Sequence, residues 1–363
     1  MASIYIHIPF CERKCQYCDF ISFTHKESCL SKYIDCLIAE IISYDVIQVD
    51  TVYIGGGTPS LVADNDIKRL LLAVRQHHSV KPDAEISIEC NPNSISENKL
   101  RLYRELGINR LSLGIQSMND KILHIIGRLH NSEQALKGLR LASKYFENIN
   151  VDLMIGLPVQ TVNDVICAID KISPFVSHIS VYSLILEEGT PLYVKVQQGE
   201  VVLASEEDTV LMYDEAYKKL EESGFKRYEV SNFSKDRPCL HNIAYWTNKD
   251  YYGFGVASHS FVKGIRASNT ESLDDYLSGV TKVDSYSVTK QQTKQEYFML
   301  RLRMAQGIDF DDYTKTFGES LMIKNEIIER LVSNGLVIIK DNCLQATDLG
   351  FHLLNYIILQ LLD

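Results

Sequence analysis

The sequence predicts an α/β protein: a partial, TIM-like (β/α)6 barrel followed by a smaller α+β domain resembling a winged helix. Three observations carry this prediction. Six short strand-like segments alternate with helical segments, which is typical of parallel sheets. Each strand alternates polar and apolar residues, and a cysteine-rich loop, Cys11 to Cys18, follows the first strand directly.

The predicted strands and helices follow one another along the first half of the chain. The strands are expected near Ser3–Ile8, Thr51–Gly55, Glu85–Cys90, Arg110–Ile115, Asn150–Ile155 and His178–Leu184. The helices between them are expected at Leu30–Tyr44, Asp64–Arg75, Ser96–Leu106, Ser132–Phe146 and Val162–Ile172. Connections of this length favour parallel pairing of successive strands.

The alternation within the strands favours a barrel with a polar interior. In the first strand, Ile4 and Ile6 share one face, whereas Tyr5 and His7 share the other, and the other five strands repeat the pattern. Strands covered by helices on both faces are apolar almost throughout. A complete eight-stranded barrel fills its interior with branched apolar side chains. We therefore expect an incompletely closed barrel whose polar face surrounds a ligand or water.

The pattern changes after residue 184. A long helix is expected at 204–223, a turn-rich aromatic stretch at 228–261, two helices at 291–304 and 323–334, a hairpin at 335–347, and a last helix from Leu349. The predicted division of the chain is a barrel at 1–225, a linking segment at 226–285, and the winged-helix-like domain at 286–363.

Composition narrows the classes of function. The 363 residues carry a formal net charge of −10, which lacks the basic footprint of a nucleic-acid binder. The first residues do not read as a signal peptide, and the longest apolar stretch, 356–362, is too short to span a bilayer. We therefore expect a cytoplasmic protein without a transmembrane segment and without a nucleic-acid partner.

Three of the nine cysteines, Cys11, Cys15 and Cys18, lie within eight residues. This spacing indicates metal binding rather than a disulfide framework. Three soft thiolates suit a [4Fe–4S] cluster and leave one iron open for an exchangeable ligand. The alternative is zinc, which needs a fourth protein ligand; His7 is a candidate, but its side chain is expected to point into the barrel.

These motifs resemble a known family. The cysteine spacing, with Tyr17 before the third cysteine, is similar to that of the radical S-adenosylmethionine (SAM) superfamily. Within it, the segments 5–11 (YIHIPFC) and 55–59 (GGGTP) resemble the family of oxygen-independent coproporphyrinogen III oxidase and the heme chaperone HemW. The resemblance covers nearly the whole chain.

The resemblance implies a SAM site at the carboxyl ends of the barrel strands, where βα loops build binding sites. Glycine in the 55–57 turn allows backbone to approach a ligand closely. Each matching polar residue could instead be a buried group with an ordinary partner. The positions that match the SAM-contacting residues of the family are Tyr5, Gly57, Thr58, Glu89, Gln116, Arg128 and Asp152.

Three features resemble HemW rather than the oxidases. Phe20 stands where the oxidases have a further cysteine, the chain begins at the first barrel strand, and segment 241–246 matches the HNxxYW motif. His241 in that motif is a candidate heme ligand, with His259 as a second candidate. The alternative for His241 is a structural role in a loop.

Three functions follow as hypotheses. The first is a heme chaperone that binds a [4Fe–4S] cluster, SAM and heme, receives electrons from a donor, and delivers heme to an apo-hemoprotein. The second is an oxygen-independent coproporphyrinogen III oxidase in porphyrin biosynthesis, acting through the same radical chemistry. The third is a radical enzyme that acts on RNA, against which the acidic charge argues.

Overall fold

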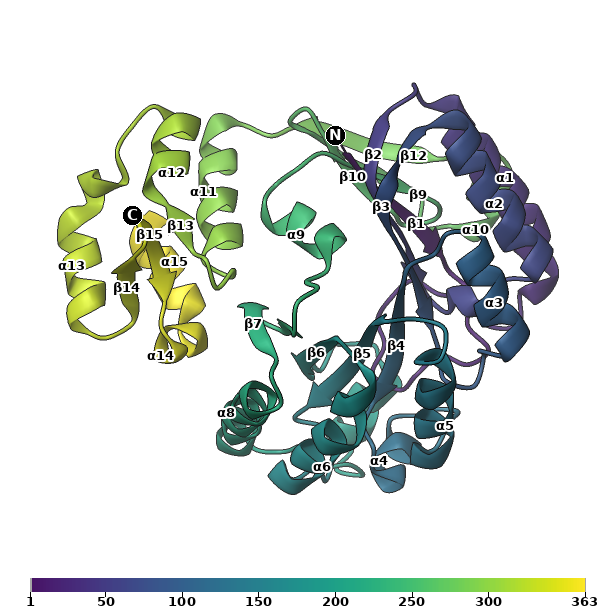
Figure 1. Cartoon of the computed structure of the whole chain (residues 1–363), viewed down its shortest axis with the longest axis horizontal. Coiled ribbons are helices and arrows are strands. Elements are labelled where there is room, and N and C mark those ends of the chain that lie inside the picture. The colour runs from purple at the N-terminus through teal and green to yellow at the C-terminus, as the bar shows by residue number, and fades with distance from the viewer. Residues whose placement is uncertain (1, 363) are drawn as a thin grey trace.

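The central element of the fold is a twelve-stranded sheet, seen in a computed structural model that describes residues 2–362. The strand order is β12-β11-β10-β9-β1-β2-β3-β4-β5-β6-β8-β7. Strands β1 to β6 are neighbours in chain order and pair in parallel, with helices between them. The predicted (β/α)6 partial barrel is therefore confirmed, and the sheet curves around an open side (Figure 1).

Five of the six barrel strands match the sequence prediction within three residues at each end, and β3 begins six residues earlier than predicted, at Ser79. The strands of the large sheet are β1 (Ala2–Ile8), β2 (Gln48–Gly56), β3 (Ser79–Cys90), β4 (Arg110–Gln116), β5 (Asn148–Ile155), β6 (His178–Ser183), β7 (Lys226–Glu229), β8 (Asn232–Ser234), β9 (Tyr251–Phe254), β10 (His259–Val262), β11 (Ile265–Asn269) and β12 (Lys282–Ser287). The small sheet contains β13 (Ile308–Asp309), β14 (Val337–Lys340) and β15 (Cys343–Ala346).

Helices α1 to α6 cover the convex face of the sheet, and α11 to α15 form most of the C-terminal domain. The helices are α1 (Leu30–Ser43), α2 (Asp64–His77), α3 (Glu97–Glu105), α4 (Asp120–Ile125), α5 (Ser132–Ala142), α6 (Val162–Ile172), α7 (Pro191–Gln197), α8 (Glu206–Glu222), α9 (Leu240–Trp246), α10 (Leu273–Leu277), α11 (Lys290–Arg301), α12 (Phe310–Phe317), α13 (Asn325–Ser333), α14 (Asp348–His352) and α15 (Leu354–Leu362). Short 3-10 helices lie at Glu27–Cys29, Pro59–Leu61, Ser173–Phe175 and Leu321–Lys324.

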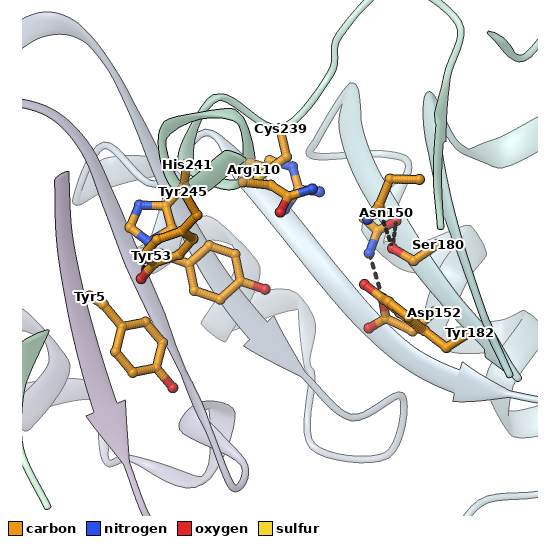
Figure 2. A pocket seen from close by; sticks show the side chains of 12 residues that line it. Tyr5, Tyr53, Arg110, Asn150, Asp152, Ser180, Tyr182, Cys239, His241 and Tyr245 are labelled. Atoms are coloured by element: carbon orange, nitrogen blue, oxygen red, sulfur yellow. Dashed lines mark hydrogen bonds between the residues drawn. The ribbon is translucent and has the colours of Figure 1, made fainter. Parts of the chain in front are cut away.

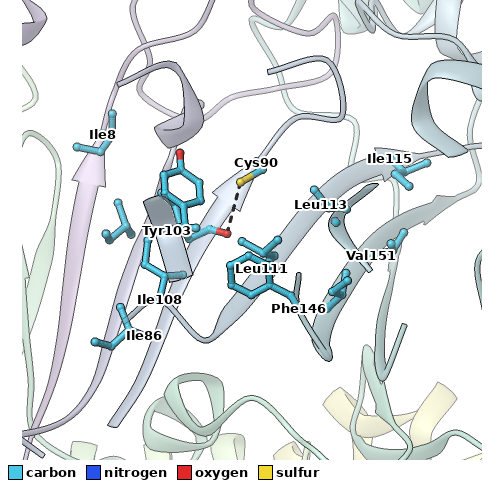
Figure 3. Close-up of a cluster of buried hydrophobic side chains, with 14 of the residues drawn as sticks. Ile8, Ile86, Cys90, Tyr103, Ile108, Leu111, Leu113, Ile115, Phe146 and Val151 are labelled. Carbon is cyan, nitrogen blue, oxygen red and sulfur yellow. Dashed lines mark hydrogen bonds between the residues drawn. The ribbon is translucent and has the colours of Figure 1, made fainter. Parts of the chain in front are cut away.

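The main hydrophobic core lies between the sheet and its helices. Apolar residues from successive strands, such as Ile86, Leu111 and Val151, pack with Tyr103 of α3 and with Phe146, which follows α5 (Figure 3). The opposite face of the same strands carries polar side chains, as the alternation predicts. In-register pairing places Tyr5 beside Tyr53 on that inner face. The concave side of the barrel is therefore polar.

The aromatic stretch after β6 contains more regular structure than its turn-rich sequence predicts. Strand β9 pairs in parallel with β1, and β10 to β12 continue that edge in antiparallel fashion. Strand β8 pairs antiparallel with β6 at the other edge, and β7 follows it. Helix α9, from the same stretch, lies inside the curve of the sheet (Figure 1). This segment therefore extends both edges of the barrel sheet.

The smaller C-terminal domain has a hydrophobic core of its own. Helices α11 to α15 pack around the β14–β15 hairpin, and β13 adds a third strand. The predicted last helix is interrupted at Leu353, so that α14 and α15 are separate. The residue bounds of the three predicted segments remain a prediction. None of the helices among residues 2–362 is long and apolar enough to cross a membrane.

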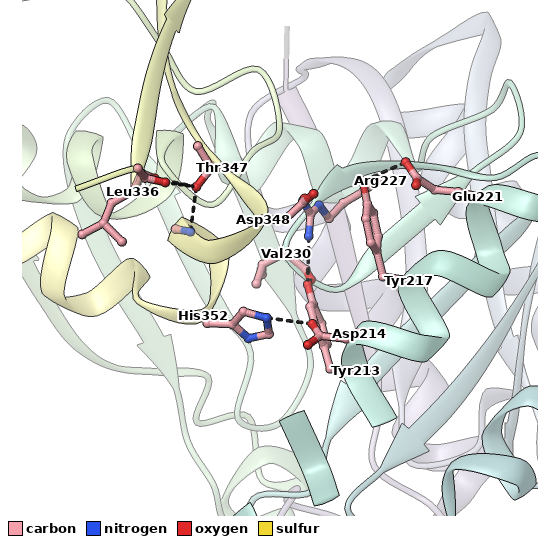
Figure 4. Close-up of polar contacts among 12 residues, drawn as sticks. Tyr213, Asp214, Tyr217, Glu221, Arg227, Val230, Leu336, Thr347, Asp348 and His352 are labelled. Carbon is pink, nitrogen blue, oxygen red and sulfur yellow. Dashed lines mark hydrogen bonds and ion pairs between the residues drawn. The ribbon is translucent and has the colours of Figure 1, made fainter. Parts of the chain in front are cut away.

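Arg227 on β7 connects the barrel to the C-terminal domain (Figure 4). Its guanidinium carbon lies 4.4 Å from the ring centre of Tyr217 on α8 and 3.7 Å from that of Phe351 on α14. It also forms a 2.5 Å ion pair with Asp348. The Arg227 side chain is 7% exposed, whereas that of Asp348 is 70% exposed. Stacking therefore contributes more to this contact than the screened ion pair does.

We expect Arg227→Ala to lower the free energy of unfolding by about 1–3 kcal/mol, because it removes packing between two rings. Asp348→Asn is the matched control, and it should cost under about 1 kcal/mol because the ion pair is exposed. Urea unfolding of both variants measures the difference. Equal losses in the two variants would contradict a contact dominated by stacking.

Candidate functional site

The cysteine loop runs from the end of β1 across the carboxyl ends of the neighbouring strands. Cys11, Cys15 and Cys18 are free thiols, each partly exposed. The Cys11 amide donates to the carbonyl of Phe23 at 3.0 Å, which fixes the loop at its base. Burial raises the pKa of Cys11, and it raises the pKa of Cys18 to about 11. Bound cations would be needed to hold these groups as thiolates at neutral pH.

Arg128, which follows α4, ties the cysteine loop to the ends of two strands. Its Nη1 donates to Cys15 Sγ at 3.2 Å, and its Nη2 donates to Asn91 Oδ1 at 2.8 Å. A further hydrogen bond reaches the carbonyl of Gly114. In this arrangement Arg128 binds a sulfur and the strand ends, and its contact with SAM remains a prediction.

The three glycines at the end of β2 form a close-fitting wall. A Cβ on Gly56, whose φ is +117°, would lie 2.7 Å from the His7 ring. A Cβ on Gly57 would lie 2.6 Å from the Phe10 carbonyl oxygen and 2.8 Å from Cys11 Sγ. Thr58 follows, and its hydroxyl donates to Cys11 Sγ at 3.7 Å. This turn therefore touches the cysteine loop directly, and only glycine fits its tightest positions.

We expect Gly57→Ala to displace the loop at Cys11, to reduce iron bound after reconstitution several-fold, and to cost about 1–3 kcal/mol in stability because the site is overpacked. Gly199→Ala is the control: its φ is +74° and no atom lies within 4 Å of the added Cβ. That variant should lose some stability, because alanine is strained at this positive φ, but it should bind iron normally. Iron analysis and thermal unfolding measure both effects; normal iron content in Gly57→Ala would contradict the contact.

Glu89 at the end of β3 faces the concave side. Its Oε1 accepts from the Tyr53 hydroxyl at 2.9 Å, and its Oε2 accepts from the Gly56 amide at 3.1 Å. Burial, followed by the nearby Asp152 carboxylate, raises the pKa of Glu89 to about 7. A cationic ligand placed beside these two carboxylates would draw Glu89 into its charged form.

The remaining predicted SAM contacts lie at different depths. The Tyr5 hydroxyl bonds His7 Nδ1 at 2.9 Å, and His7 Nε2 donates to the Ile21 carbonyl at 3.1 Å. Gln116 ends β4 in the left-handed region, with a φ of +71°. Asp152 lies deeper and accepts from Asn150 at 2.8 Å and from Ser112 at 3.2 Å. The set therefore extends from the cysteine loop into the barrel.

The cysteine set fits an iron–sulfur cluster in its chemistry. Three thiols on one partly exposed loop, with Arg128 donating to one sulfur, match the donors that such clusters take. Among residues 2–362, no three His, Cys, Asp or Glu side chains converge on a position for a single metal ion. A cubane cluster does not require that convergence, because each thiolate binds a different iron atom.

Helix α9, which carries the HNxxYW motif, closes the base of the barrel. Glu85 at the inner face of β3 accepts from the backbone amides of Leu240 and His241 at 3.1 and 3.0 Å. The His241 ring stacks on Tyr53 with 5.1 Å between centroids. Its Nδ1 is 2.8 Å from the Thr51 hydroxyl, and its Nε2 is 3.1 Å from the Tyr245 hydroxyl.

His241 is 2% exposed, and burial lowers its pKa to about 3. Both ring nitrogens already have partners inside the barrel, so a heme iron could reach the ring only if these bonds broke and α9 moved. The geometry therefore favours the structural alternative for His241. His259, the second predicted heme ligand, is exposed on β10.

Sequence reasoning missed several groups at this site. Asn91, which bonds both Arg128 and the Thr58 hydroxyl, follows β3 directly and could have been found from its place at a strand end. Arg110 occupies the same face of β4 as Ser112 and Gly114, and the period of two predicts that it points inward. Glu85 has no sequence signal for its contact with α9, because 155 residues separate it from Leu240.

Comparisons with known proteins agree with this geometry. The family model of the Radical SAM superfamily matches residues 5–172, and the family model of the HemN C-terminal domain matches residues 288–353. Heme chaperone HemW of Bacillus subtilis is 33% identical, and the match covers 96% of each chain. HemW of Buchnera aphidicola from Acyrthosiphon pisum is 36% identical, covering 97% of this chain and 96% of that one.

The chain belongs to the HemW family. The solved structure of coproporphyrinogen III oxidase (HemN) from Escherichia coli has the same fold, with a TM-score of 0.86, 23% identity, and coverage of 99% of this chain and 89% of that one. The predicted resemblance is therefore confirmed. The Radical SAM match over residues 5–172 agrees with the predicted class of the barrel.

Proposed function

We propose that this protein is a cytoplasmic heme chaperone that carries a [4Fe–4S] cluster, binds SAM, holds heme and transfers it to an apo-hemoprotein. The observation that carries this proposal is the match to HemW proteins over nearly the full length of both chains. Phe20 supports it, since the oxidases are expected to carry a further cysteine at that position.

In this proposal Cys11, Cys15 and Cys18 hold the cluster, which supplies an open iron and one-electron chemistry when an electron donor reduces it. Arg128 hydrogen-bonds Cys15 and would offset the negative charge that a thiolate-bound cluster carries. The partly exposed loop gives the donor access.

The SAM site would lie between the glycine turn and the inner carboxylates. Gly57 allows the backbone to approach the ligand, and Glu89 with Asp152 offers negative charge to the cationic parts of SAM. Gln116 and Tyr5 complete the polar lining. These proposed roles rest on the match between these residues and the SAM-contacting positions of the family.

Hemin titration tests the proposal. Anaerobically reconstituted protein should bind hemin saturably, followed by the Soret band, and should pass it to an apo-hemoprotein such as apomyoglobin. An absence of saturable binding would contradict the heme chaperone function and favour the oxidase alternative. An anaerobic assay with coproporphyrinogen III, SAM and reductant would then test that alternative.

The same titration examines His241. We expect His241→Ala to lower the free energy of unfolding by about 2–4 kcal/mol, because it removes a buried ring with two hydrogen bonds. Its hemin affinity should stay within a few-fold of the unmodified protein. Loss of hemin binding by folded His241→Ala, with binding retained in His259→Ala, would make His241 the ligand after all.

A further inference from the structure

A cavity of about 150 Å³ lies inside the barrel beside helix α9, and its lining includes Tyr5 and Asp152 of the predicted SAM site. Tyr5, Tyr53 and His241 line one side, and Asn150 and Asp152 line the other (Figure 2). A water takes about 30 Å³ of liquid volume. The cavity therefore has room for a few waters or one small ligand group.

Arg110, the first residue of β4, is the one lysine or arginine among the residues that line this cavity. The residue is 2% exposed. Within residues 2–362 its guanidinium forms no hydrogen bond and no ion pair, and its Nε is fully covered without a partner. The terminal nitrogens are therefore the part of the guanidinium that the cavity can reach.

The two nearby carboxylates, Glu85 and Asp152, accept hydrogen bonds from groups other than Arg110. Both Glu85 oxygens accept hydrogen bonds at the start of α9: from the amides of Leu240 and His241, and from the thiol of Cys239, which precedes the helix. The two Asp152 oxygens accept from Asn150 and Ser112. Glu85 and Asp152 lie close enough to interact electrostatically with Arg110, but neither bonds it. A buried cation left in this state is costly unless something else binds it.

We propose that this cavity is a binding site for a carboxylate, held by the terminal nitrogens of Arg110. A planar guanidinium matches a carboxylate with two parallel hydrogen bonds. The neighbouring Glu85 and Asp152 would repel a dianion such as phosphate more strongly than a singly charged group. The tyrosine rings on the other side of the cavity can pack against the carbon attached to the carboxylate.

Calorimetric titration with sodium acetate, at constant ionic strength set by sodium chloride, tests the site on the full-length protein. We expect saturable binding that weakens at least tenfold in Arg110→Gln. Arg101→Gln is the control, because Arg101 is an exposed arginine paired with Glu97 on α3. The control should bind acetate within twofold of the unmodified protein.

Two results overturn the proposal: no saturable acetate binding by the unmodified protein, or unchanged binding by folded Arg110→Gln. If Arg110→Gln does not fold, a crystal structure of the unmodified protein in acetate decides, since the anion must lie against Arg110. Acetate found elsewhere, or absent from the cavity, rejects the site.

The carboxylate could belong to a free small acid or to a propionate of heme, and only the second source rests on the proposed function. Hemin and its dimethyl ester separate the two. If a propionate is the ligand, hemin should bind the unmodified protein at least tenfold more tightly than the ester does. In Arg110→Gln, hemin and the ester should bind with equal affinity. Equal binding of hemin and ester in both proteins, with acetate still bound, assigns the site to a free acid. Failure of hemin to bind refutes the proposed function, while the acetate titration still decides the site.

Discussion

Cys15→Ala should abolish the iron–sulfur cluster and, with it, high-affinity SAM binding. Cys15 is one of three thiols on the loop that follows β1, and it is the sulfur to which Arg128 donates. A cluster held by three thiolates has no spare protein ligand, so the loss of one leaves two irons without protein donors. Iron and sulfide analysis after anaerobic reconstitution, together with the visible absorption of the cluster, measures the result.

Cys167→Ala provides the matched control, because Cys167 is an exposed cysteine on α6, away from the loop. It should reconstitute with the same iron content as the unmodified protein. Cys15→Ala should keep its circular dichroism and unfold at a similar temperature when both proteins are free of iron. Full iron content in Cys15→Ala would show that the cluster has another ligand and would reject the three-cysteine site.

The barrel could be predicted from sequence because its signals are local. Alternation within each strand reports which side faces the helices, and helical segments between strands report parallel pairing. The cysteine spacing and the 55–57 glycines are also local, and the structure brings them together because both follow the carboxyl ends of adjacent parallel strands. Topology alone was sufficient for this part of the site.

The base of the barrel could not be predicted in the same way. Its contacts join residues far apart in the chain, such as Thr51 with His241 and Glu85 with Leu240. No periodic pattern reports that α9 enters the barrel, and its motif therefore suggested a ligand-binding loop. The burial of His241 follows from this long-range packing. Sequence alone could not show that Arg110 lacks a partner, because that depends on Glu85 bonding the amides of α9 rather than Arg110.

SAM affinity should increase as the pH rises through about 7, because Glu89 has a pKa of about 7 in the protein without ligand. Burial is the main cause of this raised pKa, and Asp152 adds to it. The sulfonium of SAM is positively charged at every pH tested, so it favours the ionised carboxylate. Below pH 7 binding must first remove a proton from Glu89, and affinity should fall by up to about tenfold per pH unit.

Glu89→Gln isolates this contribution, since the amide has nearly the same shape and no charge. We expect the variant to bind SAM at least tenfold more weakly at pH 8, a loss of about 1.4 kcal/mol or more, and to bind with little pH dependence between pH 6 and 7.5. Folding stability should depend on pH in the opposite direction to SAM affinity. A raised carboxyl pKa means that ionising Glu89 destabilises the ligand-free protein as pH rises from about 4.5 to 7, and Glu89→Gln should remove that slope. Calorimetric SAM titrations and urea unfolding at several pH values test both effects on one pair of proteins. If the two proteins show the same pH profile for SAM, the proton lies on another group and Glu89 does not face the cation.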